Sequence, residues 1–145
     1  MNDKIFEEVT ELSGIKGLLL FDYNGKLHTK LKLSWERQSI NQLVISLMRI
    51  ISAYFIKDFR VHQLIMNYPD YNLYIRFEKR YIIAVVSDEN VSHPMLRMQL
   101  NVMTVKLNDD KQLNKKFSIM SKNLAKNWLR EPHSEKEKKI ISKLK

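Results

Sequence analysis

The sequence predicts an α+β fold in which helices flank an antiparallel sheet as an α/β sandwich. Asn24-Gly25 lies between two short apolar runs, and this dipeptide favours a tight hairpin because both residues tolerate positive φ. Three further strand-like runs, at residues 60–68, 70–78 and 81–87, follow one another with short connections at Pro69-Asp70 and Lys79-Arg80. Such connections are typical of an antiparallel meander.

Length and composition indicate one ordinary domain with a terminal appendage. The chain has 145 residues, and 44% of them are hydrophobic, which is enough for a real core. The absence of cysteine excludes disulfides, thiolate metal sites and a cysteine nucleophile, and it fits a reducing compartment. We find neither a signal peptide nor about 18 consecutive apolar residues, so we expect a cytoplasmic protein.

The net charge of +9 is concentrated in the last quarter of the chain. Residues 109–145 carry 11 Lys and Arg against 5 Asp and Glu. A basic segment of this kind attracts nucleic acid, anionic lipid or an acidic protein, and its charge alone does not choose among them. We therefore treat residues 109–145 separately, as a basic C-terminal extension.

The first half of the chain predicts a helix, the hairpin and a second, longer helix. Residues 3–13 have apolar side chains at helical spacing and end at Gly14, which suits a left-handed cap. The hairpin joins residues 15–22 to residues 26–33 through a type I′ turn. Ser39, with Gln42 three residues on, is expected to cap a helix over residues 39–56.

The apolar surface of the helix at residues 39–56 is unusually wide. Its apolar side chains cover roughly 160° of arc, against about 100° for an ordinary core-facing helix. One sheet covers only part of such a surface, so we expect the remainder to be buried on another chain. Self-association is the predicted consequence.

The remaining elements follow from burial patterns. Residues 18–21 and 81–86 are apolar almost throughout, which is typical of central strands covered on both faces, whereas residues 73–77 alternate as a strand nearer the edge does. Ser92 and Pro94 are expected to open a helix. From Leu113 the chain continues or restarts as an amphipathic helix ended by Pro132, and a short last helix is expected within residues 134–144.

No catalytic, cofactor or metal site is predicted. The hairpin turn lacks the glycine and Ser/Thr spacing of a phosphate-binding loop, and the four histidines lack the local spacing of metal ligands. Asp22 and Asp88 both end central strands and offer a conceivable acid/base pair. Aspartate at a strand end is common turn chemistry, so we do not assign catalysis to them.

The lysines of the predicted amphipathic helix, at positions 111, 115, 122 and 126, leave two interpretations open. They solvate the outer face of a helix whose apolar stripe packs on the body, or they dock an acidic partner or an anionic membrane. Nucleic acid is disfavoured because aromatic residues are not interleaved with the lysines and no binding motif is present.

Residues 3–108 resemble the roadblock family of dynein light-chain and small-GTPase regulators, within the longin-like group. The resemblance rests on the hairpin GIKGLLLFDYNGKLHTK, the apolar helix SINQLVISLMRIISAYF and the closing segment YIIAVVSDENVSHPMLRMQLNVMTVKL. The sequence departs from the family at Lys79-Arg80, where a glycine is usual, and in the long basic extension. The resemblance implies a roadblock-like domain at residues 1–108, followed by a basic amphipathic helical extension at 109–145.

The resemblance implies a five-stranded antiparallel sheet in the order 2-1-5-4-3 and a homodimer whose long helices pack together while the third strands pair. The implied function is a non-catalytic regulator or scaffold of a small Ras-like GTPase, which in bacterial members includes stimulation of GTP hydrolysis; the alternative is a peripheral membrane or nucleic-acid binding module acting through the basic extension. The dimer-interface candidates are Leu47, Met48, Ile51, Tyr54, Phe55, Val61, Gln63 and Ile65. The partner-binding candidates are Arg49, His62, Lys115, Lys122 and Lys126.

Overall fold

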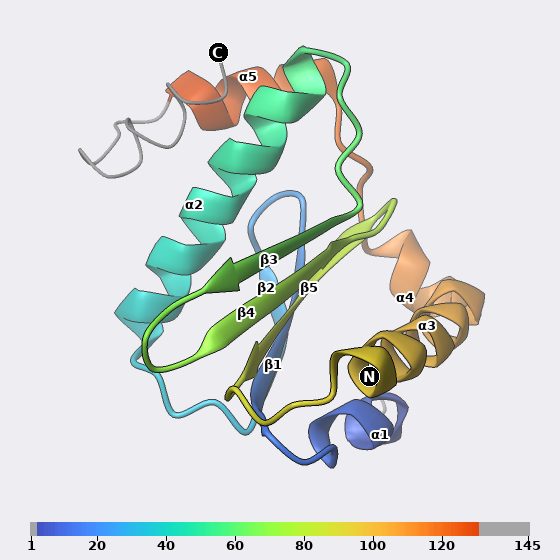
Figure 1. Cartoon of the computed structure of the whole chain (residues 1–145). Helices are drawn as coiled ribbons and strands as arrows, with labels where there is room; N and C mark the ends of the chain where they lie inside the picture. The colour runs from blue at the N-terminus through green and yellow to red at the C-terminus, as the bar shows by residue number, and fades with distance from the viewer. Residues whose placement is uncertain (1–2, 131–145) are drawn as a thin grey trace.

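The structure is a five-stranded antiparallel sheet with helices on both faces (Figure 1). It is a computed structural model that describes residues 3–130. The strands are β1 (Ile15–Asp22), β2 (Leu27–Leu31), β3 (Gln63–Asn67), β4 (Asn72–Phe77) and β5 (Tyr81–Ser87). The helices are η1 (Asp3–Phe6), α1 (Glu7–Thr10), α2 (Arg37–Ile56), α3 (His93–Asp109), α4 (Lys111–Lys115) and α5 (Lys122–Arg130).

The strand order β2-β1-β5-β4-β3 confirms the order implied by the roadblock resemblance. Both apolar runs lie in the middle of the sheet, where Leu19 of β1 pairs with Lys30 of β2 on one side and with Ala84 of β5 on the other. The strands β2 and β3 are the two edges. Alternate side chains of the central strands therefore enter two separate cores, as expected for strands covered on both faces.

Each face of the sheet carries its own hydrophobic core. Leu18, Leu20 and Ile83 pack with η1, α1, α3 and α4 on one face. Leu19 and Ile82 pack against α2 on the other face. This division accounts for the nearly continuous apolar runs, since residues 17–22 of β1 and all of β5 are buried on both faces.

The hairpin between β1 and β2 is confirmed, but its predicted turn type is wrong. Gly25 has φ of +81°, whereas Asn24 is not in the positive-φ region that a type I′ turn needs at both central positions. The Gly25 amide donates to the carbonyl of Asp22, and the Asp22 amide donates to the carbonyl of Lys26. The loop is therefore a three-residue turn whose last residue, Gly25, takes the left-handed conformation.

Helix α2 begins two residues earlier than predicted. Its N-cap is Glu36, which makes no capping side-chain bond, so Ser39 is a first-turn residue and not the cap. Its end is a Schellman motif in which the amide of Phe59 donates to the carbonyl of Tyr54, with Asp58 at φ +62°. Among the described helices, α2 has the length and composition to cross a membrane, but half of its apolar window is buried within the fold.

Other boundaries differ modestly from the predictions. The predicted helix at residues 3–13 is a short η1–α1 pair that ends at Thr10, and β3 and β4 are shorter than their apolar runs. Helix α3 opens as predicted, because the Ser92 hydroxyl accepts a hydrogen bond from the amide of Met95 and a proline lies in the first turn. Gly14 takes the expected positive φ, of +92°.

Within residues 109–130 the C-terminal extension forms two helices, α4 and α5, and not the single amphipathic helix that was expected. The chain leaves helical conformation between α4 and α5, and the predicted apolar stripe is divided between the two cores. Leu113 and Phe117 pack on the α3 side of the sheet, whereas Met120, Leu124 and Trp128 pack on the α2 side. The predicted stop at Pro132 and the predicted last helix lie outside the described residues.

Candidate functional site

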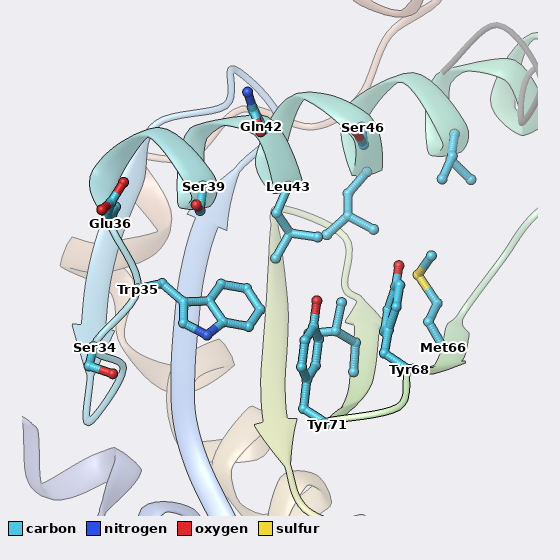
Figure 2. A pocket seen from close by; sticks show the side chains of 13 residues that line it. Ser34, Trp35, Glu36, Ser39, Gln42, Leu43, Ser46, Met66, Tyr68 and Tyr71 are labelled. Carbon is cyan, nitrogen blue, oxygen red and sulfur yellow. The ribbon is translucent and has the colours of Figure 1, made fainter. Parts of the chain in front are cut away.

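An open groove lies between the first half of α2 and the β3–β4 end of the sheet (Figure 2). Its volume is about 660 Å³. The groove is defined by its apolar and aromatic lining, which we call the aromatic groove: Trp35, Leu43, Leu47, Ile50, Met66, Tyr68, Tyr71 and Leu73. Its rim is polar and comprises Ser34, Glu36, Ser39, Gln42 and Ser46. A concave apolar surface with a few polar groups at its border is typical of a binding site.

Three aromatic rings from two loops shape the floor of the aromatic groove. Trp35 precedes α2 and meets Tyr71 edge-on, with ring centroids 5.0 Å apart. Tyr71 in turn stacks on Tyr68, at 4.9 Å and 26° between planes. Figure 2 shows all three rings below the Ser39–Ser46 side of α2. Sequence reasoning missed this trio, although three aromatic residues in polar connecting segments were a signal for a binding surface.

The aromatic groove adjoins the free edge of the sheet. Strand β3 pairs with β4 on one side only, with Ile65 opposite Tyr74. Ile65 is 43% exposed. The next residue of β3, Met66, lines the aromatic groove. An edge strand presents unpaired backbone N–H and C=O groups, which is a template for pairing with another chain.

Three of the predicted interface residues are core residues of the single chain. Leu47, Met48 and Ile51 are almost fully buried and pack in the α2-side core. The prediction divided the apolar surface of this helix between its own sheet and a second copy. It did not consider that the C-terminal extension of the same chain covers part of that surface. In this structure the chain itself covers most of their side-chain surface, although Leu47 also lines the aromatic groove, and their part in a dimer stays a prediction.

The remaining interface candidates lie at or near the surface. Tyr54 and Phe55 are half-buried at the end of α2, and Tyr54 meets Phe59 edge-on with ring centroids 6.3 Å apart. Val61 and Gln63 are half-buried, and Ile65 is exposed on the edge strand. Whether these residues join two copies stays a prediction.

Helix α5 accounts for much of the apolar surface of α2 that the sequence assigned to a partner. It packs along α2, and Trp128 also reaches the β1–β2 turn, where its indole Nε1 donates to the carbonyl of Tyr23 at 3.0 Å. Arg49 of α2 donates from Nε to the Trp128 carbonyl at 3.3 Å and is only 5% exposed. The chain's own extension therefore covers Arg49 in this structure, and its contact with a partner stays a prediction.

The other partner-binding candidates are exposed but do not form one surface. Lys115 belongs to α4, whereas Lys122 and Lys126 belong to α5. Lys122 makes a loose, exposed ion pair with Asp58, at 3.8 Å. His62 is exposed just before the edge strand. The break between α4 and α5 thus separates lysines that a single helix would have aligned.

The conceivable acid/base pair of Asp22 and Asp88 is excluded by strand register. Asp22 pairs with Tyr81, whereas Ser87, next to Asp88, pairs with Ile15 at the opposite end of the sheet. Asp22 is instead a structural carboxylate. Its Oδ1 accepts the amides of Asn24 and Lys26, and its Oδ2 lies 2.8 Å from Nε2 of His28.

The described residues hold no cluster of three or more His, Cys, Asp or Glu side chains suited to a metal ion. The buried tyrosines have structural roles. Burial, reinforced by the negative charge of Glu78, raises the pKa of Tyr23 and of Tyr81 well above the usual value of 10. Both hydroxyls consequently stay protonated and donate, Tyr23 to the Glu78 carbonyl and Tyr81 to Oδ1 of Asn108.

Comparison with solved structures identifies the architecture. A Roadblock/LC7 domain from Streptomyces avermitilis superposes with a TM-score of 0.58 at 14% identity, covering 74% of this chain and 94% of that one. The chain has the Roadblock/LC7 fold. Myxococcus xanthus MglB matches this roadblock fold with a TM-score of 0.57 at 16% identity, covering 72% of this chain and 86% of its own. No protein-family model matches the sequence, and no curated protein matches it.

A further structure, MglB with tetrameric arrangement, extends the match beyond the minimal roadblock fold. It superposes with a TM-score of 0.57 at 14% identity and covers 86% of this chain and 88% of that one. Residues 1–108 are 108 of the 145 residues, so a match over 86% of the chain takes in some of the C-terminal extension. The identities are low, and these similarities show the fold alone.

Proposed function

We propose that the chain is a cytoplasmic, non-catalytic regulator or scaffold that acts as a homodimer and binds a small Ras-like GTPase. The main observation that supports this proposal is the roadblock fold with a free β3 edge beside the aromatic groove. Such an arrangement is suited to protein contacts. Similarity to the MglB structures supports a roadblock-type GTPase regulator over other uses of the fold. A regulator that repositions the residues of its GTPase needs no catalytic side chain of its own.

The proposed dimer keeps Tyr54 and Ile65 from the predicted interface and omits the buried Leu47, Met48 and Ile51. Its contacts would be the β3 edge around Ile65, the α2 end at Tyr54 and the groove-facing side of α2 at Ser46. Ser46 lines the same groove as Met66, which is next to Ile65 in β3. The tetrameric arrangement named for one MglB structure supports self-association of this fold.

The alternative function, membrane or nucleic-acid binding through the extension, has less structural support. An amphipathic helix binds a bilayer by burying its apolar face in it. Here Met120, Leu124 and Trp128, which would form that face, already pack on the body of the protein. The exposed lysines remain, but without an apolar face they provide only screened electrostatic attraction.

The decisive experiment is binding to a Ras-like GTPase, beginning with one encoded beside this gene. The full chain is immobilised and offered the GTPase loaded with GDP or with a non-hydrolysable GTP analogue, and GTP hydrolysis is measured separately. We expect retention that depends on the nucleotide. A failure to retain any Ras-like GTPase in either state would contradict the proposal.

A groove variant makes this test specific to the site. Tyr71→Ser removes the ring that links Trp35 to Tyr68, at a half-buried position. The control is Val102→Ser, which changes an exposed apolar residue on α3. We expect weaker retention of the GTPase by the first variant only, if the aromatic groove is part of the contact surface.

A further inference from the structure

A second concave site lies on the other face of the sheet, and every residue that lines it has a polar or charged side chain. It is formed by the turn between β4 and β5, the end of α3 and helix α4, and its volume is about 680 Å³. We call it the basic pocket, and its lining consists of Glu78, Lys79, Arg80, Asn108, Lys111, Asn114 and Lys115. The pocket unites residues that are about 30 positions apart in sequence, so the sequence alone did not reveal it.

The charge of the basic pocket is strongly positive. It has four cationic side chains and a single carboxylate, that of Glu78. Lys79, Lys111 and Lys115 are exposed, and within residues 3–130 none of them lies within ion-pair distance of a carboxylate. Cations that face one another across a concave surface repel, and an anionic ligand relieves that repulsion.

The walls of the basic pocket are held in place before any ligand binds. Arg80 donates from Nη1 to the carbonyl of Phe117 at 3.1 Å, which anchors the β4–β5 turn to the extension. Asn114 donates from Nδ2 to the carbonyls of Leu107 and Asp110, at 3.0 and 2.8 Å, which joins α4 to the end of α3. Preformed walls reduce the entropic cost of binding.

The lining also orients one neutral donor. Tyr81 donates its hydroxyl to Oδ1 of Asn108 at 2.8 Å, and the raised pKa of Tyr81 keeps that proton in place. With its oxygen occupied, Asn108 has its amide NH₂ group left to donate. The pocket therefore combines ammonium, guanidinium and amide donors, all of which bind carboxylate oxygens.

We propose that the basic pocket binds an acidic segment of a partner protein, with at least two neighbouring Asp or Glu side chains. A flat anionic membrane fits a concave site poorly, and nucleic acid would need aromatic or apolar residues for its bases, which the lining lacks. Lysine and arginine also bind phosphate, so the competition with tripolyphosphate described below separates the two sources of negative charge. The amide of Leu113 at the start of α4 already donates to the Asp110 carboxylate and is not free to bind a phosphate oxygen.

The test is fluorescence anisotropy of the full chain with a labelled peptide of six alternating Asp and Glu residues. We expect binding at 25 mM NaCl that weakens strongly at 300 mM, because exposed charges are screened. Lys79→Gln with Lys111→Gln removes one cation from each wall and should weaken binding about fivefold. Lys26→Gln with Lys30→Gln removes the same charge from exposed positions of the β1–β2 hairpin and should change it less than twofold.

Two competitors decide between sources of negative charge. Inorganic tripolyphosphate and vesicles containing anionic phospholipid are each titrated against the peptide complex. The proposal is supported when neither displaces the peptide at a matched concentration of charge. It is overturned when either competitor binds more tightly through the same lysines, or when both double variants lose affinity equally. The test uses no GTPase, so its result is independent of the function proposed above.

Discussion

Trp128 of α5 lies so close to Gly25 of the β1–β2 turn that a β-carbon on the glycine would be 2.7 Å from the indole Cη2 atom. The same indole donates its N–H to the carbonyl of Tyr23 in that turn. The hairpin and the extension are therefore fitted to each other, although about 100 residues separate them. Residues 120–130 complete the α2-side core and are not an appendage to it.

Replacing Gly25 by alanine is expected to lower the free energy of unfolding by about 2 kcal/mol, because a β-carbon is strained at positive φ and displaces Trp128. Urea unfolding followed by tryptophan fluorescence measures the change. The matched control is Asn24→Ala in the same turn, which should alter stability by less than about 0.5 kcal/mol. Equal stabilities of the two variants would show that the contact with Trp128 is not tight.

Met48→Glu is expected to unfold the single chain, not merely to separate two copies. Met48 is fully buried, and an unpaired carboxylate there should cost more than about 3 kcal/mol. Circular dichroism during heating measures the loss. Met98→Glu, at a half-exposed position on α3, is the control and should melt like the wild type. A stably folded Met48→Glu monomer would restore the dimer interface predicted from sequence.

Asp58→Gly is expected to stabilise the protein by about 0.5 kcal/mol. Asp58 has φ of +62° at the end of α2, a conformation in which glycine has no β-carbon penalty. Asp58→Ala should destabilise by a similar amount or more. Both variants remove the loose ion pair with Lys122, so their difference in denaturation midpoint isolates the backbone effect. A lower midpoint for the glycine variant than for the alanine variant would contradict this explanation.

Stability should fall as the pH rises above 10. Burial raises the pKa of Tyr23 and Tyr81 in the folded protein, whereas in the unfolded chain both titrate near 10. Below pH 10 both the folded and the unfolded chain hold these protons, so the contribution of the two tyrosines to the free energy of unfolding is constant. Above pH 10 the unfolded chain loses them first, which favours unfolding.

Urea midpoints at pH 8, 9.5 and 10.5 measure this dependence. Tyr23→Phe should make the decline above pH 10 shallower, because phenylalanine has no proton to lose. Tyr54→Phe is the control, since Tyr54 is half-buried on the surface of α2. Identical pH profiles for the wild type and Tyr23→Phe would contradict the proposed cause.

Ile65→Lys is expected to turn a dimer into a monomer in sedimentation experiments. A lysine on an edge strand is charged and opposes pairing with another strand. Val105→Lys makes the same change at a residue of α3 that is 62% exposed, and it should leave the mass unchanged. A wild-type chain that sediments as a monomer, or an Ile65→Lys variant that remains a dimer, would contradict the proposed β3 contact.

The sheet was predictable because its signals are local. Apolar runs at residues 18–21 and 81–86 identify strands covered on both faces, and Asn24-Gly25 identifies the hairpin. Short connections then force an antiparallel meander. The exact turn type was not predictable, because Asn24 is compatible with either sign of φ and the hydrogen bonds of Asp22 decide between them.

The path of the extension was not predictable from periodicity. Leu113, Phe117, Met120, Leu124 and Trp128 fit one helical stripe, but a stripe does not specify how many surfaces it covers. Ser121 was the available signal for a new helix, since its hydroxyl accepts the amide of Leu124. The basic pocket depends on where the extension runs, and the aromatic groove depends on contacts between loop residues. Both sites were therefore less predictable than the sheet.

The passage of residues 116–121 from one core to the other has a mechanical consequence. The segment runs past the end of the sheet that holds the β1–β2 and β4–β5 turns, with Phe117 anchored on one face and Trp128 on the other. Tension applied through the C-terminus would have to peel α5 from α2 before it reached any strand. The first part of the molecule to yield under such tension would thus lie outside the sheet, which would stay intact while α5 separated from α2.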